Sequence, residues 1–235
     1  MKLAIMQPYV FPYIGYFQLI NAVDSFVFYD DVNFMKHGWI NRNKILINGR
    51  EFLFSIPLKN CSQHHKINET MIANTEYTVW NNNFLKSIEN SYKKSPFYHS
   101  IAQLVKDTLS KNYHLISDLA ISSIQNVCRY LDLDTDIQYS SKQYAETAGQ
   151  EKADRLISIC HQAEATIYIN PVGGVDLYSK EYFTKNGIDL FFLRSNDIEY
   201  KQFDNEFIPN LSIIDVLMFN SPVEIRKKLT MYELI

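Results

Sequence analysis

The feature that most constrains the fold is the order of patterns at the start of the chain. Residues 2–6 (KLAIM) form a short apolar run that stops at a Gln-Pro pair, which is typical of a buried strand entering a loop. Apolar side chains then recur at helical spacing from Ile14 to Val23, and the next segment, SFVFYD, is rich in β-branched and aromatic residues. Such a strand–helix–strand unit almost always joins parallel strands, so ligand-binding loops are expected at their carboxyl ends.

The remainder of the chain predicts two additions to this unit. The segment NKILINGREFLFSIPL is typical of a hairpin, because Asn48-Gly49 between two apolar strands is a strong turn signal. A second strand–helix–strand pattern starts at about residue 150, with TIYIN and DLFFL as strands and GVDLYSKEYFTKNG between them as a helix that ends at Gly187. Further predicted elements are a helix in EKADRLISICHQA, a strand at 67–72, helices near 77–93, 97–110 and 115–132, and two closing helices in LSIIDVLMF and PVEIRKKL.

We therefore predict an α/β fold with a Rossmann-like, mostly parallel sheet, an antiparallel hairpin addition and a helical middle region. The 235 residues suit a single α/β domain, 1–235, with a helical subregion at about 77–132. Apolar residues make up 46% and charged residues 21%, which predicts a folded chain and not a disordered one.

Charge and cysteine content exclude several classes of partner and compartment. The formal net charge is -3 and no basic stripe is present, so neither nucleic acid nor an anionic membrane is expected as the main partner. No stretch reaches about 18 uncharged apolar residues, so no membrane span is expected. The cysteines Cys61, Cys128 and Cys160 are widely spaced without a CxxC pair, and prolines interrupt any signal-peptide pattern. These features predict a cytoplasmic protein.

The first candidate site is the loop from Gln7 to Gly15. A loop between a first strand and a first helix presents free backbone N–H groups and the positive helix end, a common way to hold phosphate. The loop has a single glycine and neither a Walker lysine nor a GxGxxG run, which disfavours the common nucleotide-binding modes. A binding role and a purely structural one both remain open. The predicted substrate-binding residues here are Gln7, Tyr9, Tyr13 and Tyr16.

The second candidate is DDVNFMKHGWINRNKI, residues 30–45, which follows the second predicted strand. Lys36 and Arg42 could bind a phosphate or carboxylate, and His37 could move a proton near neutral pH. The alternative is structural: Asn and Asp cap turns, and Arg42 could simply pair with Asp30. The predicted catalytic residues are His37, Asp31 and Lys36, and the predicted substrate-binding residues are Asp30, Trp39, Asn41 and Arg42.

The third candidate is NPVGGVDLY, residues 170–178. Gly173 and Gly174 permit close backbone approach to a ligand, with Tyr178 beside them, but a tight turn explains the glycines equally well. Asp215 stands in the apolar run LSIIDVLMF, where an ionised carboxylate is costly unless it is paired. It is therefore either a buried structural partner or a substrate-binding residue. No metal site is predicted, because the adjacent histidines at 64 and 65 have no third ligand nearby.

Three segments resemble the WbqC-like family, bacterial proteins associated with O-antigen and other surface-polysaccharide gene clusters. They are MQPYVFPYIGYFQLINAVDSFVFYDDVNFMKHGWINRNKI, KADRLISICHQAEATIYINPVGGVDLY and FIPNLSIIDVLMFN, and they span nearly the whole chain. One departure is Asn170-Pro171, which stands where the family has a small Ser-Gly type pair ahead of the glycines. That difference puts a substrate contact at this pair in doubt.

The resemblance implies a substrate class, a nucleotide-linked amino sugar, and a transferase or ligase that adds an acyl or aminoacyl group to the sugar amine. In this hypothesis Lys36 and Arg42 hold the diphosphate, Trp39 or Tyr9 stacks on base or sugar, and His37 or Asp31 deprotonates the amine. The cofactor stays open between ATP with magnesium, held by Asp30 or Asp31, and an acyl donor. The oligomeric state is unknown.

Two other functions stay open. PYIGY lies where nucleotidyltransferase-type Rossmann folds carry an HxGH element, which suggests an ATP-dependent adenylating enzyme, although Tyr13 and Tyr16 replace both histidines. A non-catalytic protein that binds a sugar nucleotide or scaffolds a biosynthetic complex would need the same pocket.

Overall fold

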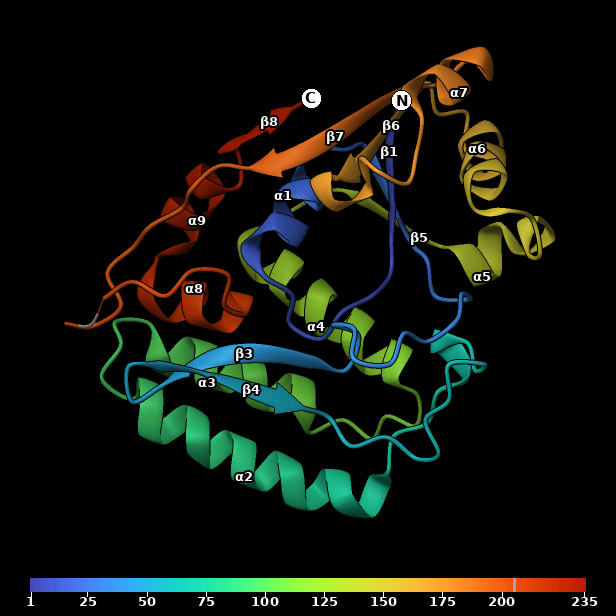
Figure 1. The fold of residues 1–235 in the computed structure, drawn as a ribbon. Coiled ribbons are helices and arrows are strands. Elements are labelled where there is room, and N and C mark those ends of the chain that lie inside the picture. Colours follow the sequence, from blue (N-terminus) through green and yellow to red (C-terminus); the bar gives the residue numbers. More distant parts are fainter. Residues whose placement is uncertain (205) are drawn as a thin grey trace.

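A six-stranded sheet forms the centre of the protein, whose computed structural model describes residues 1–204 and 206–235. The strand order is β5-β2-β1-β6-β7-β8, and each pair is parallel except β7 with β8. This confirms the predicted α/β fold with a mostly parallel sheet (Figure 1). The strands are β1 (Lys2–Met6), β2 (Ser25–Phe28), β5 (Asp136–Tyr139), β6 (Ile167–Pro171), β7 (Asp189–Ser195) and β8 (Tyr232–Leu234).

The opening strand–helix–strand unit has the predicted topology. Helix α1 (Ile14–Asn21) connects β1 to β2, which pair in parallel from Leu3 opposite Ser25 to Met6 opposite Phe28. On its other side β1 pairs with β6, which comes much later in the chain. The strand order therefore reverses between β1 and β6, and the loops after these two strands leave the same edge of the sheet. Such a switch point is where open α/β sheets bind their ligands.

Alternate side chains of the strands enter two separate cores. Ala4 and Phe26 belong to one core, which α1, α4 (Ile116–Leu131), α8 (Ile213–Phe219) and α9 (Pro222–Lys228) cover. Leu3 and Val27 face the other core, which α6 (Lys152–Gln162) and α7 (Lys180–Lys185) cover with the short α5 (Ser140–Gln143) and η2 (Ala145–Thr147) nearby. Figure 1 shows these two groups of helices on opposite sides of the sheet. We call the two sides the α1 face and the α6 face.

The predicted hairpin and the helical middle region are both present. Strands β3 (Arg42–Ile47) and β4 (Arg50–Ser55) are antiparallel, and Asn48 and Gly49 adopt φ angles of 51° and 71°, as a type I′ turn requires. The hairpin packs on α2 (Asn74–Tyr92), where the Phe54 and Phe84 rings are 4.6 Å apart. Helix α3 (Tyr98–Leu109) completes this layer, and its buried side chains join those of the α1 face in one continuous cluster.

Some predicted elements were wrong. Residues 67–72 hold the 3-10 turn η1 (Ile67–Glu69) and not a strand, because the amides of Ile67 and Asn68 bond to the carbonyls of Val32 and Asp30. The helix predicted between TIYIN and DLFFL is shorter: the turn η3 (Val172–Gly174) precedes α7, which starts only after Ser179 caps it. Strands β5 and β8 were not predicted from the sequence.

The described residues include no helix that combines the length and the apolar character needed to cross a lipid bilayer.

Candidate functional site

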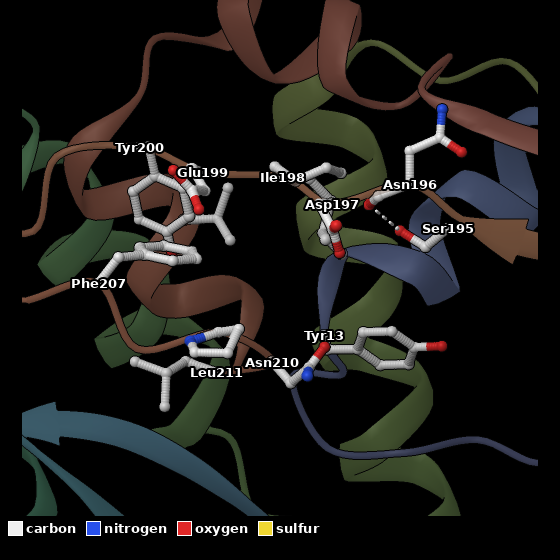
Figure 2. A pocket seen from close by; sticks show the side chains of 13 residues that line it. Tyr13, Ser195, Asn196, Asp197, Ile198, Glu199, Tyr200, Phe207, Asn210 and Leu211 are labelled. Atoms are coloured by element: carbon white, nitrogen blue, oxygen red, sulfur yellow. Dashed lines mark hydrogen bonds between the residues drawn. The ribbon is translucent and has the colours of Figure 1, made fainter.

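A cavity of 660 Å³ lies where the carboxyl end of β7 meets the start of α1. Small-molecule sites commonly measure about 300–1,000 Å³. Figure 2 shows Tyr13 and Asn210 on one side of this cavity and the chain from Ser195 to Glu199 on the other. Its lining combines carboxylate, amide and aromatic side chains, among them Tyr13, Asn196, Asp197, Glu199, Phe207 and Asn210.

The charged groups in the lining are all acidic. Asp197 and Glu199 line the cavity, and no lysine or arginine is among the described residues that do so. Neither carboxylate has an ion-pair or hydrogen-bond partner within the described parts of the chain. The Lys228 ammonium contacts the backbone of the cavity wall, where it donates to the carbonyl of Glu199 at 3.1 Å. The cavity therefore attracts positively charged ligands.

One wall of the cavity is the connection between β7 and α8, residues 196–212, which we call the β7–α8 connection. Its described residues contain no helix or strand. Aromatic contacts hold it down: the Tyr200 and Phe207 rings are 5.1 Å apart, and Phe203 packs edge-on against Phe219 at 4.7 Å. This wall was not predicted, because its sequence has no periodicity. Its length was the available signal, since connections of more than about 12–15 residues without secondary structure are often functional.

The buried Asp215 carboxylate holds the β7–α8 connection in place through hydrogen bonds. Asp215 is 0% exposed and accepts hydrogen bonds from the hydroxyls of Tyr92 at 2.8 Å and Tyr200 at 2.6 Å, and from the Gln202 amide at 2.8 Å. Burial raises the pKa of Asp215, and these three hydrogen bonds offset part of that rise. Asp215 was predicted to bind substrate, but its enclosure lets it act on a ligand only through Tyr200 and Gln202.

The loop between β1 and α1 is held in a strained conformation. Phe11 has a φ of 41°, which is uncommon for a residue with a side chain. Its amide donates to the Ser123 hydroxyl at 2.9 Å, and its carbonyl accepts from the Asn43 amide and the Ser212 hydroxyl, both at 2.7 Å. Three distant segments therefore fix this backbone. Such over-determined strain is typical of loops that position a site.

The tyrosines of this loop have different surroundings. Tyr13 is 38% exposed and lines the cavity, and its ring occupies the space that a Cβ at position 15 would need, so a larger residue than Gly15 would displace this ring. Tyr16 is 2% exposed and donates to the carbonyl of Gln7 at 2.9 Å. Tyr9 is partly buried beside Tyr16, with the ring centroids 5.8 Å apart. Burial raises the pKa of Tyr9 to about 12, so its hydroxyl stays protonated at neutral pH.

The exposed loop at residues 36–39 adjoins the opening loop but does not line the cavity. The amide of Val10 donates to the carbonyl of Ile40 at 3.0 Å, which places the two candidate segments side by side. None of Lys36, His37, Trp39, Asn41 and Arg42 is among the described residues that line the 660 Å³ cavity.

The side chains of Arg42 and Asn41 stabilise this loop through hydrogen bonds to backbone carbonyls. The Arg42 guanidinium donates to the carbonyls of His37 and Gly38 and lies 5.6 Å from the centre of the Trp39 ring. The alternative that Arg42 pairs with Asp30 was therefore wrong. Asn41 donates to the carbonyl of Ile56 at 2.9 Å, which ties the loop to the end of the hairpin.

Two acidic residues that follow β2 form a buried network. The Asp31 carboxylate pairs with the Arg155 guanidinium at 2.6 Å and accepts from Ser140 at 2.5 Å. Asp30 accepts from the Ser141 hydroxyl at 2.6 Å and from its amide at 3.0 Å. Both acids were predicted to contact substrate, and in the structure their carboxylates are bound by neighbouring side chains that join β2 to α5 and α6.

At one position of the glycine pair after β6, any larger residue would displace a neighbouring side chain. A Cβ on Gly174 would lie 1.8 Å from the amide nitrogen of Asn170, whereas a Cβ on Gly173 would meet nothing within 4 Å. Asn170 itself is 7% exposed and accepts from the Tyr168 hydroxyl at 3.3 Å. Gly174 therefore allows the Asn170 side chain to lie against the backbone.

Comparison with known proteins identifies the family of this chain. The model of the WbqC-like protein family matches residues 7–227. The chain belongs to the WbqC-like protein family. It is also similar to an uncharacterized protein of Mycobacterium tuberculosis (strain ATCC 25618 / H37Rv), Rv1507c, with 30% identity over 226 residues and 95% of each chain covered. No solved structure gives a significant match.

In this WbqC-like chain, Gly174→Ala is expected to lower the free energy of unfolding by about 1–3 kcal/mol, because the new Cβ must displace the buried Asn170 amide. Gly173→Ala is the matched control, and a change within about 0.5 kcal/mol is expected for it. Urea denaturation of the two variants measures both values. Equal losses at the two positions would contradict the role assigned to Gly174.

Proposed function

We propose that the protein transfers an acyl or aminoacyl group to the amine of a nucleotide-linked amino sugar in the synthesis of O-antigen or another surface polysaccharide. Membership of the WbqC-like family supports the biosynthetic setting. The observation that carries the proposal is the cavity beside Tyr13, where the charged side chains of the described lining are two carboxylates without a partner among the described residues. A protonated amine is the part of such a substrate that this cavity attracts.

The lining suits the sugar as well as its amine. Carboxylates at Asp197 and Glu199 can accept hydrogen bonds from an ammonium group, and the amides of Asn196 and Asn210 can bond to hydroxyls. The rings of Tyr13 and Phe207 offer flat apolar surfaces to a sugar face. In this proposal the cavity holds the acceptor sugar, and the diphosphate stays outside because the carboxylates repel it.

The chemical step requires a base near the amine. The ammonium group loses one proton to become a nucleophile, and Asp197 is assigned as the acceptor of that proton. The amine nitrogen then attacks the carbonyl carbon of a thioester or an acyl adenylate. An amide bond forms, the bond to sulfur or to phosphate oxygen breaks, and the departing group takes the second proton from nitrogen. His37 and Asp31, the two predicted bases, are not among the described residues that line this cavity.

We expect Asp197→Asn to weaken the binding of an amino sugar about tenfold to a hundredfold, because a hydrogen bond to a charged partner contributes roughly 1.5–3 kcal/mol. Calorimetric titration with glucosamine measures this, and N-acetylglucosamine, which has no cationic amine, should bind the wild type and the variant alike. His37→Ala is the control outside the cavity. If His37→Ala weakened binding and Asp197→Asn did not, the amine site would lie in the exposed loop at residues 36–39.

Mass spectrometry tests the reaction itself. The protein is incubated with nucleotide-linked amino sugars, ATP, amino acids and acyl thioesters, and a product heavier by one acyl or aminoacyl group is expected. ATP cleaved to pyrophosphate without sugar modification would instead support an adenylating enzyme. That alternative has weaker structural support, because Tyr16, which replaces the second histidine of HxGH, is enclosed and bound to the Gln7 carbonyl. Unchanged masses across the panel would leave a binding protein.

A further inference from the structure

A second polar cluster lies on the α6 face of the sheet, at the switch point. Gln7 follows β1, Tyr29 follows β2 and Asn170 is near the end of β6, and these three strands are neighbours. The amide of Tyr29 donates to the carbonyl of Met6 at 2.9 Å, which places Tyr29 beside Gln7. Tyr178, from the connection after η3, packs with Tyr29 against the core of the α6 face.

Asn170 carries an unused hydrogen-bond donor, on a side chain that lies against the backbone of Gly174. Its side chain is 7% exposed, its oxygen accepts from Tyr168, and its amide nitrogen donates to none of the described residues. Among the described residues, the fully enclosed side-chain atoms without a partner are on Gln18 and Asn81, so the Asn170 nitrogen is not fully enclosed. A nearly buried amide donor without a protein partner is uncommon, and a bound acceptor would satisfy it.

The other members of the cluster also have open polar groups. The side chain of Gln7 and the hydroxyl of Tyr178 have no hydrogen-bond partner among the residues that the structure describes. Burial raises the pKa of Tyr178, so its hydroxyl remains a donor at neutral pH. Arg155 contacts the cluster: its guanidinium lies 4.7 Å from the centre of the Tyr29 ring, hydrogen-bonds to Tyr29 and is paired with Asp31.

These properties favour an uncharged ligand with many hydrogen-bonding atoms. The side chains of the cluster, Gln7, Tyr29, Asn170 and Tyr178, are neutral, and the Arg155 guanidinium beside them is paired with Asp31, which disfavours a free phosphate. A nucleobase instead presents carbonyl and ring-nitrogen acceptors to amide and hydroxyl donors. The rings of Tyr29 and Tyr178 can pack on a planar base. The position at the switch point is also where α/β sheets bind nucleotides.

We propose that Gln7, Tyr29, Asn170 and Tyr178 form a nucleoside-binding subsite. This inference rests on the proposed function, because it assigns the two parts of one substrate to the two faces of the sheet at its carboxyl edge. The nucleoside lies on the α6 face, and the amino sugar lies in the cavity on the α1 face. The diphosphate would cross the edge between β1 and β6, along the loop that the strained Phe11 holds in place.

Titrations with the separate halves of the substrate test the subsite. The four ribonucleoside 5′-monophosphates and glucosamine are titrated into the wild type and the variants Asn170→Ala, Tyr178→Phe, Gln7→Ala and Asp197→Asn. At least one nucleotide should bind the wild type, and each of the first three variants should weaken it about fivefold to thirtyfold through one lost hydrogen bond. Glucosamine binding should be unchanged in them, and Asp197→Asn should show the converse.

The outcomes separate this inference from the proposed function. Gln7→Ala covers the case in which Asn170→Ala disturbs the fold, since the Gln7 side chain makes no hydrogen bond within the described chain. Wild-type affinity for every nucleotide in Gln7→Ala and Tyr178→Phe, or no nucleotide binding by the wild type, would overturn the subsite. Nucleotide binding that these variants weaken, without turnover of any amino-sugar nucleotide, would support the subsite and overturn the transferase proposal.

Discussion

Replacing Arg155 with methionine is expected to lower the free energy of unfolding by about 3–5 kcal/mol, because the change leaves the Asp31 carboxylate buried without a countercharge. The side chains of Asp31 and Arg155 are only 6% and 5% exposed, and their 2.6 Å contact connects the end of β2 to α6. Methionine has a similar length, so it fills most of the space that the arginine leaves. Urea denaturation followed by circular dichroism measures the loss.

A double variant separates the lost charge pair from lost packing. In Asp31→Asn/Arg155→Met the carboxylate is gone, and the oxygen of the new asparagine can still accept the hydrogen bond from Ser140 that Asp31 accepts at 2.5 Å. The double variant should therefore be more stable than Arg155→Met alone, by roughly 1–3 kcal/mol. A single-variant loss of less than about 1 kcal/mol would show that the carboxylate is solvated or protonated in the folded protein.

The part of the fold that follows from local sequence signals could be predicted. Asn48-Gly49 specifies its turn through two positive φ angles, and the apolar periods of β1 and α1 specify their buried faces. The short strands β5 and β8 could not be predicted, because DIQY and YEL carry no period and become strands only by pairing with β2 and β7. The strand predicted at 67–72 was wrong for a related reason, since amides in this segment bond to the carbonyls of the distant residues 30 and 32.

The candidate site depends even more on contacts between distant residues. The sequence indicated that ligand-binding loops lie at the carboxyl edge, and the structure brings the loop after β1 to the cavity through Tyr13. Asp31 looked like a free acid, but its partner Arg155 is 124 positions later in the chain. The Asp197 and Glu199 carboxylates were missed because nothing local distinguishes them from solvated acids. The roles of His37, Lys36 and Arg42 in catalysis or substrate binding stay predictions.

Asp215→Asn is expected to lower the free energy of unfolding by about 2–4 kcal/mol at neutral pH. The two Asp215 oxygens accept three hydrogen bonds, and an asparagine would turn its NH₂ group toward either Tyr92 or the Tyr200 and Gln202 pair. At least one buried donor would then face another donor. Asp204→Asn is the matched control on the β7–α8 connection, because its side chain is 98% exposed, and a change within about 0.5 kcal/mol is expected.

A comparison of the wild type with Asp215→Asn at several pH values gives a second test, in which the burial of Asp215 sets the direction of the expected change in stability. Burial raises the pKa of Asp215 above its ordinary value of 3.8, so the folded state binds the proton more tightly than the unfolded state. The contribution of Asp215 to stability is therefore fully present below pH 3.8 and falls as pH rises through the raised pKa. Because the asparagine of the variant does not titrate, the advantage of the wild type over Asp215→Asn should shrink across that window and then become constant. An advantage that grows with pH instead would mean that the hydrogen bonds from Tyr92, Tyr200 and Gln202 outweigh desolvation and hold the carboxylate ionised.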